Sequence, residues 1–332
     1  MDRASHLSLI LDLSASQWHL SGEPPGNQTP LTLSTFLSHV LTFVNSHVAS
    51  KPENTLSVFG AFPGKSVLLH SSEAALGTDT DVPGDPNSYR PFKLVDSVIA
   101  RGIERELEGY DMDDNEPPVA LVGALTKALC HINRISQHAD KPGTNPEDPD
   151  SLPEPRILIL SVSPDLSASY IPVMNSIFSA QKMKVVIDVC KVLGPDTVFL
   201  QQVAHLTGGS YIYLEHRNAL LQYLIMSFLP PPSMRQYIAV PKQDKVDFRA
   251  ACFCHKTIVE IAFICSVCLS IFCRPTPICS TCKTKFPIPS LQRLRASVPP
   301  EKTPGTPNGS ATPRRNGSTP GTHRPSIAAN LR

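Results

Sequence analysis

The stretch His6-Leu-Ser-Leu-Ile-Leu-Asp-Leu-Ser-Ala-Ser16 joins an apolar run to a short polar loop near the start of the chain. We predict the first strand over residues 6–13, because the run has the length and the apolar character of a buried strand. Comparable runs alternate with segments of helical periodicity across residues 1–232. This alternation predicts an α/β fold, with helices on both faces of a doubly wound, mostly parallel, six-stranded sheet.

The same periodicities place the other elements of the sheet and its covering helices. Further strands are predicted at residues 55–62, 66–70, 156–162, 184–192 and 210–214. Helices are predicted at residues 30–44, 91–107, 119–136, 168–182, 196–206 and 218–229. Pro63-Gly64 joins the second and third strands as a hairpin, which predicts one antiparallel pairing in the sheet.

Composition divides the chain of 332 residues into four parts. After the α/β domain at 1–232, a connecting segment at 233–251, strand-like over 235–251, is expected to dock rather than to act as a flexible linker. It leads into a cysteine-rich module at 252–290. Residues 291–332 are basic and rich in proline, serine and threonine, and we expect this tail to be disordered.

Charge and hydropathy exclude several classes of partner. The 30 basic and 29 acidic side chains give a net charge of +1, so no overall field draws the chain to nucleic acid or to a membrane. No stretch reaches 18 continuous apolar residues and no basic region precedes the first strand, which predicts a soluble, unexported chain without a membrane partner. In a reducing compartment, the seven cysteines clustered between Cys252 and Cys282 favour metal binding over disulfides.

Two CxxC pairs, Cys265-Ser-Val-Cys268 and Cys279-Ser-Thr-Cys282, lie within this cluster. Each pair can form a tight turn that presents two thiolates, and two such turns supply the four soft ligands of tetrahedral zinc. We therefore predict a zinc site at Cys265, Cys268, Cys279 and Cys282. Four thiolates would also suit an iron–sulfur cluster, but nothing else in the sequence indicates redox chemistry.

The remaining ligand types of the cluster, Cys252, Cys254, His255 and Cys273, could build a second zinc site interleaved with the first, as in RING-like domains. Against this, a C-x-C pair is not expected to fold back as a CxxC turn does. A single histidine is also more often a surface or hydrogen-bonded group. The sequence leaves one or two zinc ions open.

Asp12, Ser14 and Ser16 follow the first strand at alternate positions. Ligands of an open parallel sheet bind beyond the carboxyl ends of its strands, and a carboxylate with two hydroxyls is an oxygen cluster suited to Mg²⁺. One carboxylate is nevertheless a weak cage for this ion. We expect these side chains to hold the turn by hydrogen bonds to the backbone, rather than to bind Mg²⁺.

This DxSxS loop, with six strands in this order, resembles the first loop of the metal-ion-dependent adhesion site of the von Willebrand A family. The resemblance implies that a threonine from a second loop and an aspartate after the fourth strand complete the ligands. Here Val119 opens the matching helix without a preceding threonine, and Asp165 lies later than the family pattern places its acid. The resemblance therefore implies a von Willebrand A type of sheet with an incomplete metal site.

The most specific stretches are Val246-Asp-Phe-Arg-Ala-Ala-Cys-Phe-Cys-His255 and Ile264-Cys-Ser-Val-Cys-Leu-Ser-Ile-Phe-Cys273, with Gly123-Ala-Leu-Thr-Lys-Ala-Leu129 in the preceding domain. Together they resemble the family of smaller von Willebrand A, C4 zinc-finger subunits of the TFIIH core, the general transcription and nucleotide excision repair factor. The resemblance covers residues 7–289. It implies a nuclear, non-catalytic subunit of a hetero-oligomer.

The resemblance also implies the partners of the chain. The chief one is the other von Willebrand A subunit of the TFIIH core, which bears a RING-like zinc domain. DNA is met indirectly, because the assembly carries two helicase-type ATPases that open it. Two alternatives remain from the residues alone: a RING-like ubiquitin ligase, and direct DNA binding by the zinc module and the basic tail.

Overall fold

The computed structural model describes residues 3–22, 30–72, 89–108, 117–139, 153–165, 169–238, 246, 248–255, 257–287, 289 and 292–293. These ranges include every residue of the six predicted strands and all nine cysteines. The predicted disordered tail lies almost entirely outside the described residues.

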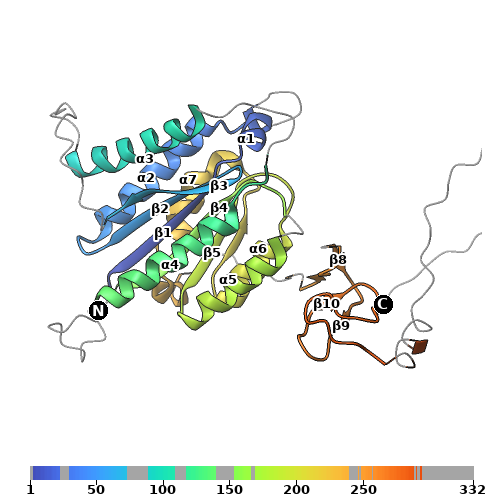
Figure 1. Ribbon diagram of the computed structural model, residues 1–332. Coiled ribbons are helices and arrows are strands. Elements are labelled where there is room, and N and C mark those ends of the chain that lie inside the picture. The colour runs from blue at the N-terminus through green and yellow to red at the C-terminus, as the bar shows by residue number, and fades with distance from the viewer. Residues whose placement is uncertain are drawn as a thin grey trace, which may run out of the picture.

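One sheet organises the first part of the molecule (Figure 1). Its strands run in the order β3-β2-β1-β4-β5-β6, with β2 and β3 antiparallel and all other neighbours parallel. The predicted doubly wound, mostly parallel, six-stranded sheet is therefore confirmed. The strands are β1 (Ser5–Asp12), β2 (Thr55–Phe62), β3 (Lys65–Ser71), β4 (Glu154–Ser161), β5 (Val186–Lys191) and β6 (Tyr211–Tyr213).

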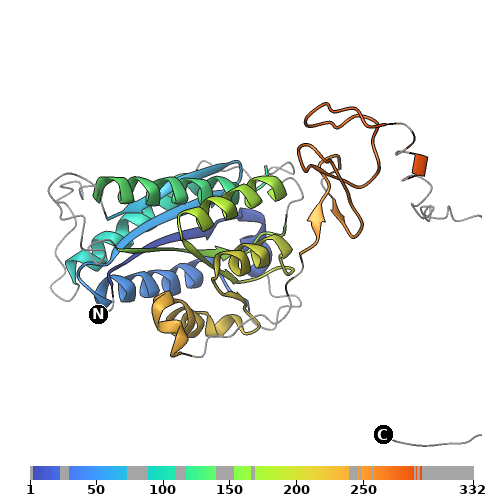
Figure 2. The same cartoon turned by 90° about the horizontal axis from the view of Figure 1, so that it is seen from below.

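Helices cover both faces of this sheet (Figure 2). Successive side chains of a strand point to opposite faces, so Leu9 and Leu11 of β1 join one apolar layer and Ile10 joins the other. The first layer packs against α2 (Leu33–Ser50), α3 (Arg90–Glu108) and α7 (Leu220–Tyr223). The second packs against α4 (Leu121–Ala139), α5 (Tyr170–Lys182) and α6 (Val198–Thr207). None of the helices in the described ranges is long and apolar enough to cross a membrane.

Two helical segments differ from the predictions. A short helix α1 (Ala15–Gly22) follows β1 where only a loop was expected. The helix predicted at 218–229 is present but is not uniformly α-helical: it consists of a 3-10 turn, η2 (Arg217–Ala219), one α turn, α7, and a π-helical turn, η3 (Leu224–Phe228). The last carbonyls of a helix have no partner within it, and the prolines at 230–232 offer no N–H, so the carbonyls at the end of this segment need a partner from elsewhere.

That partner is Arg156 of β4, a fully buried side chain. Its Nη1 donates to the carbonyl oxygens of Phe228 at 2.6 Å and Pro230 at 3.1 Å, and its Nη2 donates to that of Leu229 at 3.0 Å. A guanidinium is favourable at the carbonyl end of a helix, so Arg156 fixes the last helical segment to the sheet.

An ion pair attaches the next segment to β5 of the sheet. Arg235, in the 3-10 turn η4 (Pro232–Gln236), donates from Nη1 and Nη2 to the two carboxylate oxygens of Asp188 in β5, at 2.6 and 2.5 Å. Asp188 also accepts the N–H of Ser210 at 2.9 Å. The prediction of strand across residues 235–251 is wrong where the structure describes it, except for β7 (Ala250–Ala251).

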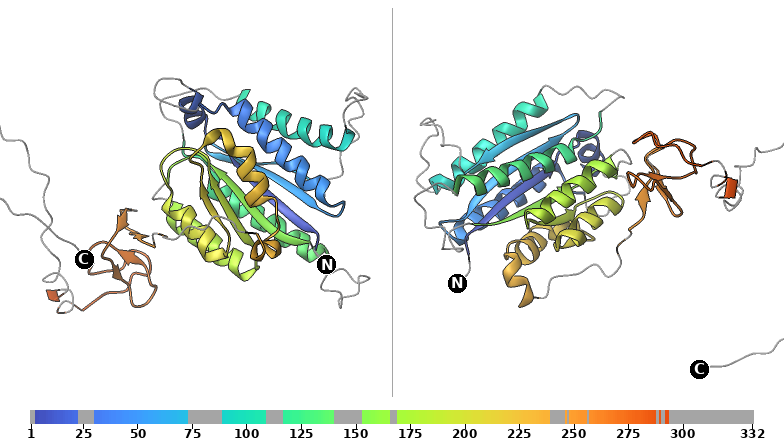
Figure 3. Two further views of the ribbon diagram at one scale, coloured as in Figure 1. Left: turned by 180° about the vertical axis from the view of Figure 1, so that it is seen from behind. Right: turned by 60° about the horizontal axis from the view of Figure 1, so that its bottom comes forward.

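The C-terminal module lies next to α6 (Figures 1 and 3). It contains two small antiparallel pairs: β7 with β8 (Ile258–Val259), and β9 (Phe263–Ile264) with β10 (Ile271–Phe272). The strand that opens the module is attached to the α/β layers. Gln202 donates to Arg249 O at 3.3 Å, the rings of His205 and Phe248 lie 5.3 Å apart, and Ala251 is buried in the second apolar layer.

Candidate metal centres

The four cysteines of the two CxxC pairs come together in the C-terminal module. The Sγ atoms of Cys265 and Cys282 lie 3.7 Å apart, those of Cys268 and Cys279 lie 3.5 Å apart, and all four lie within 4.8 Å of one another. Thiolates about 2.3 Å from a zinc ion at tetrahedral vertices lie about 3.8 Å apart. The group therefore has the size and the donor atoms that a zinc ion requires.

The two CxxC turns share hydrogen bonds that the sequence analysis missed. In both turns, the N–H of the first cysteine donates at 2.9 Å to the carbonyl oxygen five residues later. The hydroxyl of that later residue then lies 3.0 Å from Cys268 Sγ in one turn and 3.1 Å from Cys282 Sγ in the other: Ser270 and Thr284. Hydroxyl donors stabilise thiolates, and their common position, two residues after the second cysteine, is visible in the sequence.

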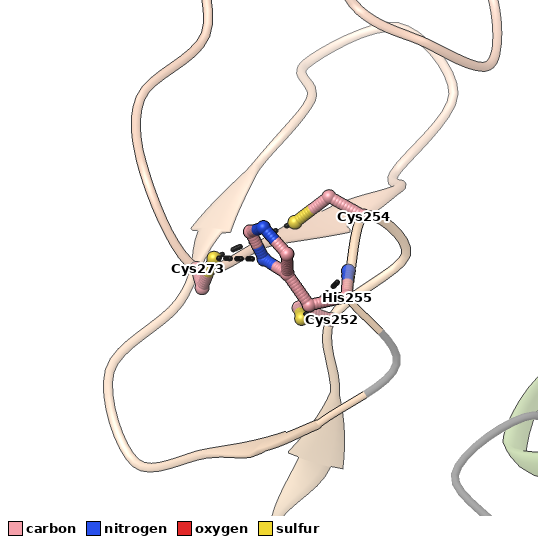
Figure 4. A group of neighbouring side chains, drawn as sticks. All are labelled: Cys252, Cys254, His255 and Cys273. Atoms are coloured by element: carbon pink, nitrogen blue, oxygen red, sulfur yellow. Dashed lines mark hydrogen bonds between the residues drawn. The ribbon is translucent and has the colours of Figure 1, made fainter.

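Cys252, Cys254, His255 and Cys273 form a second group, also within 4.8 Å of one another. Figure 4 shows the sulfur of Cys254 and the ring of His255 pointing toward Cys273. Cys254 Sγ lies 3.4 Å from Cys273 Sγ, and His255 Nδ1 lies 3.1 Å from the same sulfur. The C-x-C spacing was counted against such a group, yet the four side chains do come together.

In the part of the module that the structure describes, little besides these sulfurs forms a core. Its buried cluster consists of Cys265, Cys279 and Phe272, with Phe253 and Phe286 packed against them. A core of this size does not offset the conformational entropy of folding, so small domains of this kind depend on metal ions or disulfides.

The loop after β1 has a different arrangement. Asp12 is fully buried, and its Oδ2 accepts the backbone N–H of Val162 at 2.9 Å and of Ser163 at 2.7 Å. Its Oδ1 accepts the Ser163 hydroxyl at 2.9 Å, and the Ser161 hydroxyl donates to Oδ2 at 3.4 Å. Burial raises the pKa of Asp12, whereas the hydrogen bonds from Ser163 and Val162 lower it. Both carboxylate oxygens thus already accept hydrogen bonds from the end of β4.

Lys191, at the end of β5, directs its ammonium group into this loop and was missed by the sequence analysis. Its Nζ donates to Ser163 O at 2.5 Å. Burial lowers the pKa of Lys191 to about 8, and attraction to Asp12, Asp165 and Asp196 opposes that shift. At neutral pH a protonated lysine therefore supplies positive charge among these carboxylates.

The other candidate ligands of this loop are also engaged. Ser14 Oγ accepts the N–H of Gln17 at 3.4 Å, at the start of α1, and lies 3.1 Å from Ser16 Oγ. Asp165 Oδ2 accepts the N–H of Phe199 at 3.0 Å, in the first turn of α6, where a carboxylate is favourable.

The second loop of the family pattern pairs with the β2–β3 hairpin. Val119 forms an antiparallel bridge with Pro63, and the N–H of Ala120 donates to Phe62 O at 3.0 Å. Among the described residues of this segment, from 117 onward, no hydroxyl contacts Asp12. Because Mg²⁺ needs several free oxygen ligands, the residues of this loop do not fit a magnesium site.

Comparison with known proteins covers both the sheet and the cysteine groups. The family model "Transcription factor Tfb4" matches residues 4–283. The "General transcription and DNA repair factor IIH subunit tfb4" of Schizosaccharomyces pombe is 37% identical over 295 residues, 88% of this chain and 92% of that protein. The corresponding Arabidopsis thaliana subunit TFB4 is 35% identical over 291 residues, 86% of this chain and 90% of that protein.

A solved structure agrees with these relatives. The crystal structure of the TFIIH p34 N-terminal domain aligns with a TM-score of 0.54 and 26% identity, covering 67% of this chain and 97% of that chain. The sheet is of the von Willebrand A type that the loop sequence resembles. With the family model matching most of the sequence, from β1 through the second CxxC pair, the chain belongs to the transcription factor Tfb4 family.

Proposed function

We propose that this chain is a non-catalytic structural subunit of the TFIIH core, acting in nucleotide excision repair and in transcription initiation by RNA polymerase II. The observation that carries the proposal is the similarity to named TFIIH subunits, which continues from the sheet through the cysteine module. Action on nuclear DNA through such a complex places the chain in the nucleus.

A structural role is supported by where the reactive side chains lie. Ser71 Oγ is 3.3 Å from His131 Nε2, but both residues are buried, so a substrate cannot reach this pair. The carboxylate of Asp12 is equally inaccessible. In this proposal, the described residues therefore act by folding and by contact rather than by catalysis.

In the same proposal, Cys265, Cys268, Cys279 and Cys282 hold one zinc ion. Four thiolates saturate tetrahedral zinc and leave no open position, which is the arrangement of structural zinc sites. When bound, the ion supplies folding free energy rather than a reactive water. Metal analysis of the purified chain distinguishes zinc from an iron–sulfur cluster.

The proposed partner is the other von Willebrand A subunit of the TFIIH core, the one that bears a RING-like zinc domain. Because the loop after β1 does not present a metal to an acidic ligand, recognition must use a broader surface. Stable protein interfaces of this kind bury upwards of roughly 1,200 Å². Exposed apolar side chains in the described part of the chain, such as Met226, Ile261 and Leu269, are available for such contacts.

Co-expression tests the proposal. Together with the RING-bearing subunit, the chain should give more soluble protein and a one-to-one complex on gel filtration, without added Mg²⁺. Deletion after Leu291 is the control, because the resemblance and the family match both end before it, and it should leave the complex intact. A monodisperse monomer that ignores the partner, or ubiquitin transfer by the isolated chain, would overturn the structural role.

A further inference from the structure

Three segments of the C-terminal module share one sequence pattern. They are Cys252-Phe-Cys-His255-Lys-Thr257, Cys265-Ser-Val-Cys268-Leu-Ser270 and Cys279-Ser-Thr-Cys282-Lys-Thr284. Each has a cysteine, a second cysteine or histidine three residues later, and a hydroxyl residue two further on. The pattern places two zinc-binding side chain types at the CxxC spacing, with histidine in place of the second cysteine in the first segment.

The backbone repeats along with the pattern. In all three segments the N–H of the first cysteine donates at 2.9 Å to the carbonyl oxygen five residues later. The N–H of His255 points at Cys252 Sγ, 3.4 Å away, as the N–H of Cys282 points at Cys279 Sγ, 3.5 Å away. Cys252 and His255 therefore stand in the same relation as the ligand pair of a CxxC turn.

A hydroxyl also reaches a sulfur in each segment. Thr257 Oγ1 lies 3.5 Å from the sulfur of the first ligand, Cys252, because the second ligand of this segment is a histidine; in the other two segments, Ser270 and Thr284 contact the second cysteine at shorter distances. A hydroxyl beside a buried sulfur is the donor expected at a thiolate. The first segment thus has the turn, the N–H to sulfur bond and the hydroxyl of a zinc turn.

Two further sulfurs complete a fourfold group. Cys254 points to the same centre from within the turn, and Cys273 arrives from the end of β10 (Figure 4). Vertices of a zinc tetrahedron lie about 3.8 Å apart for two sulfurs and about 3.6 Å apart for sulfur and nitrogen. The observed 3.4 Å from Cys254 Sγ to Cys273 Sγ and 3.1 Å from His255 Nδ1 to Cys273 Sγ are slightly shorter than these edges.

Packing does not explain why these side chains meet. Cys254 and His255 are exposed and Cys273 is half-buried, so apolar burial does not hold them against one another. Their imidazole and two thiols converge with the buried thiol of Cys252, and together these four groups are a ligand set of soft donors for zinc.

We propose that Cys252, Cys254, His255 and Cys273 bind a second zinc ion through three thiolates and the Nδ1 atom of the imidazole. Cys273 lies between the two CxxC pairs in sequence, so the two sites interleave along the chain. The second site also follows Ala251, which is buried in the α/β layers. The second ion therefore fixes the start of the module where it joins the α/β domain.

The zinc content of the full-length chain tests this inference, and the test does not depend on the role that we propose for the chain in TFIIH. We expect two zinc ions per chain, falling to one in Cys254→Ser and in Cys273→Ser. The matched control is Cys130→Ser, an exposed cysteine of α4 outside both groups, which should keep two. His255→Ala should lose one ion, and His255→Cys should restore it, because cysteine supplies an equivalent ligand.

X-ray absorption at the zinc edge tests the second site in the unmutated chain, so the result does not depend on whether a variant folds. Two sites built from these groups give seven sulfur ligands and one nitrogen ligand for two ions, whereas the Cys265 group alone gives only sulfur. One zinc per chain with an all-sulfur shell would overturn the second site and leave the first intact. Two ions that persist in both cysteine variants would overturn it as well.

Discussion

Substitutions of Asp12 test whether its carboxylate stabilises the sheet through hydrogen bonds or binds a metal ion. In Asp12→Ala, the backbone N–H groups of Val162 and Ser163 lose their acceptor, and Val162 is fully buried. In Asp12→Asn, the side-chain oxygen can take the place of Oδ2 and accept both N–H groups. The amide group would then stand beside the Ser163 hydroxyl, which can rotate to accept from it.

The expected magnitudes depend on these contacts. A buried donor left without a partner costs about 1 to 3 kcal/mol, which is the cost expected at Val162 in Asp12→Ala; the N–H of Ser163, which is half-buried, adds a smaller cost. Asp12→Asn keeps both bonds in neutral form and should cost about 1 to 2 kcal/mol, since charge-assisted bonds are roughly twice as strong as neutral ones. Burial, which raises the pKa of Asp12, partly offsets this loss because a neutral amide is easier to bury.

The chain contains its own reporter for this measurement. Trp18 is the one tryptophan in the sequence, it is buried against Phe36, and its Nε1 donates to the carbonyl oxygen of Asp12 at 2.9 Å. Its fluorescence during urea unfolding of the full-length chain gives the free energy for each variant. Ser16→Ala is the control, because the Ser16 hydroxyl contacts Ser14 Oγ rather than β4, and it should lie within about 0.5 kcal/mol of the parent.

Titration with Mg²⁺ completes the test. The parent and both Asp12 variants should unfold at the same urea concentrations with and without millimolar Mg²⁺. If Mg²⁺ stabilised the parent, and if Asp12→Asn removed that effect as fully as Asp12→Ala, the loop would be a metal site and the reasoning would be refuted.

Three further outcomes are expected. Cys265→Ser or Cys279→Ser should release zinc and make the C-terminal module protease-sensitive while the Trp18 unfolding transition persists, because the module has little core without its metal; limited proteolysis with mass spectrometry checks this. Arg235→Met should destabilise the α/β domain by about 3 kcal/mol in urea unfolding, because it leaves Asp188 buried without its cation, and the further change Asp188→Asn should recover part of that loss. Burial and nearby histidines lower the pKa of His6 from its usual value near 6.5 to about 3, so the unfolded state binds a proton that the folded state does not as pH falls below 6.5. Between pH 6.5 and 5 this should cost up to about 2 kcal/mol, a slope that His6→Gln should flatten.

The strands were predictable because burial on both faces requires nearly continuous apolar sequence. Residues 6–13 were predicted for β1, and the structure has Ser5–Asp12, buried throughout. The hairpin of β2 and β3 was predictable from Pro63-Gly64, because a proline followed by a glycine favours a turn between two apolar runs.

The helix α1 could not be predicted from hydrophobic periodicity. It buries only Trp18 and Ser21, so its sequence carries no apolar stripe. It is held by single hydrogen bonds, from Trp18 to the Asp12 carbonyl and from Ser21 to Leu31 O at 2.8 Å. Such tertiary contacts are not visible in a window of sequence.

Some residues of the candidate sites could be predicted from the sequence and others could not. The four residues of the CxxC pairs were predicted from spacing alone, and the structure brings them together. The proximity of the second group was harder to predict, because the C-x-C spacing of Cys252 and Cys254 is not that of a ligand turn, whereas Cys252 and His255 have the CxxC spacing. Lys191 lies in an apolar run whose sequence gives no sign of a site. Its ammonium group comes near Asp12 only through the fold of the sheet.

The contacts of Arg156 also bear on how the chain folds while it is being synthesised. Its three carbonyl partners lie 72 to 74 residues further along the chain, and a ribosome adding about 5 to 20 residues per second needs several seconds to reach them. During that interval the segment that covers Arg156 is missing, so the guanidinium remains in water and the apolar side chains of the same face, such as Leu158 and Leu160, stay partly uncovered. The nascent domain should therefore remain a client of chaperones until residue 230 has emerged, and a chain stalled before that point should be degraded rather than accumulate.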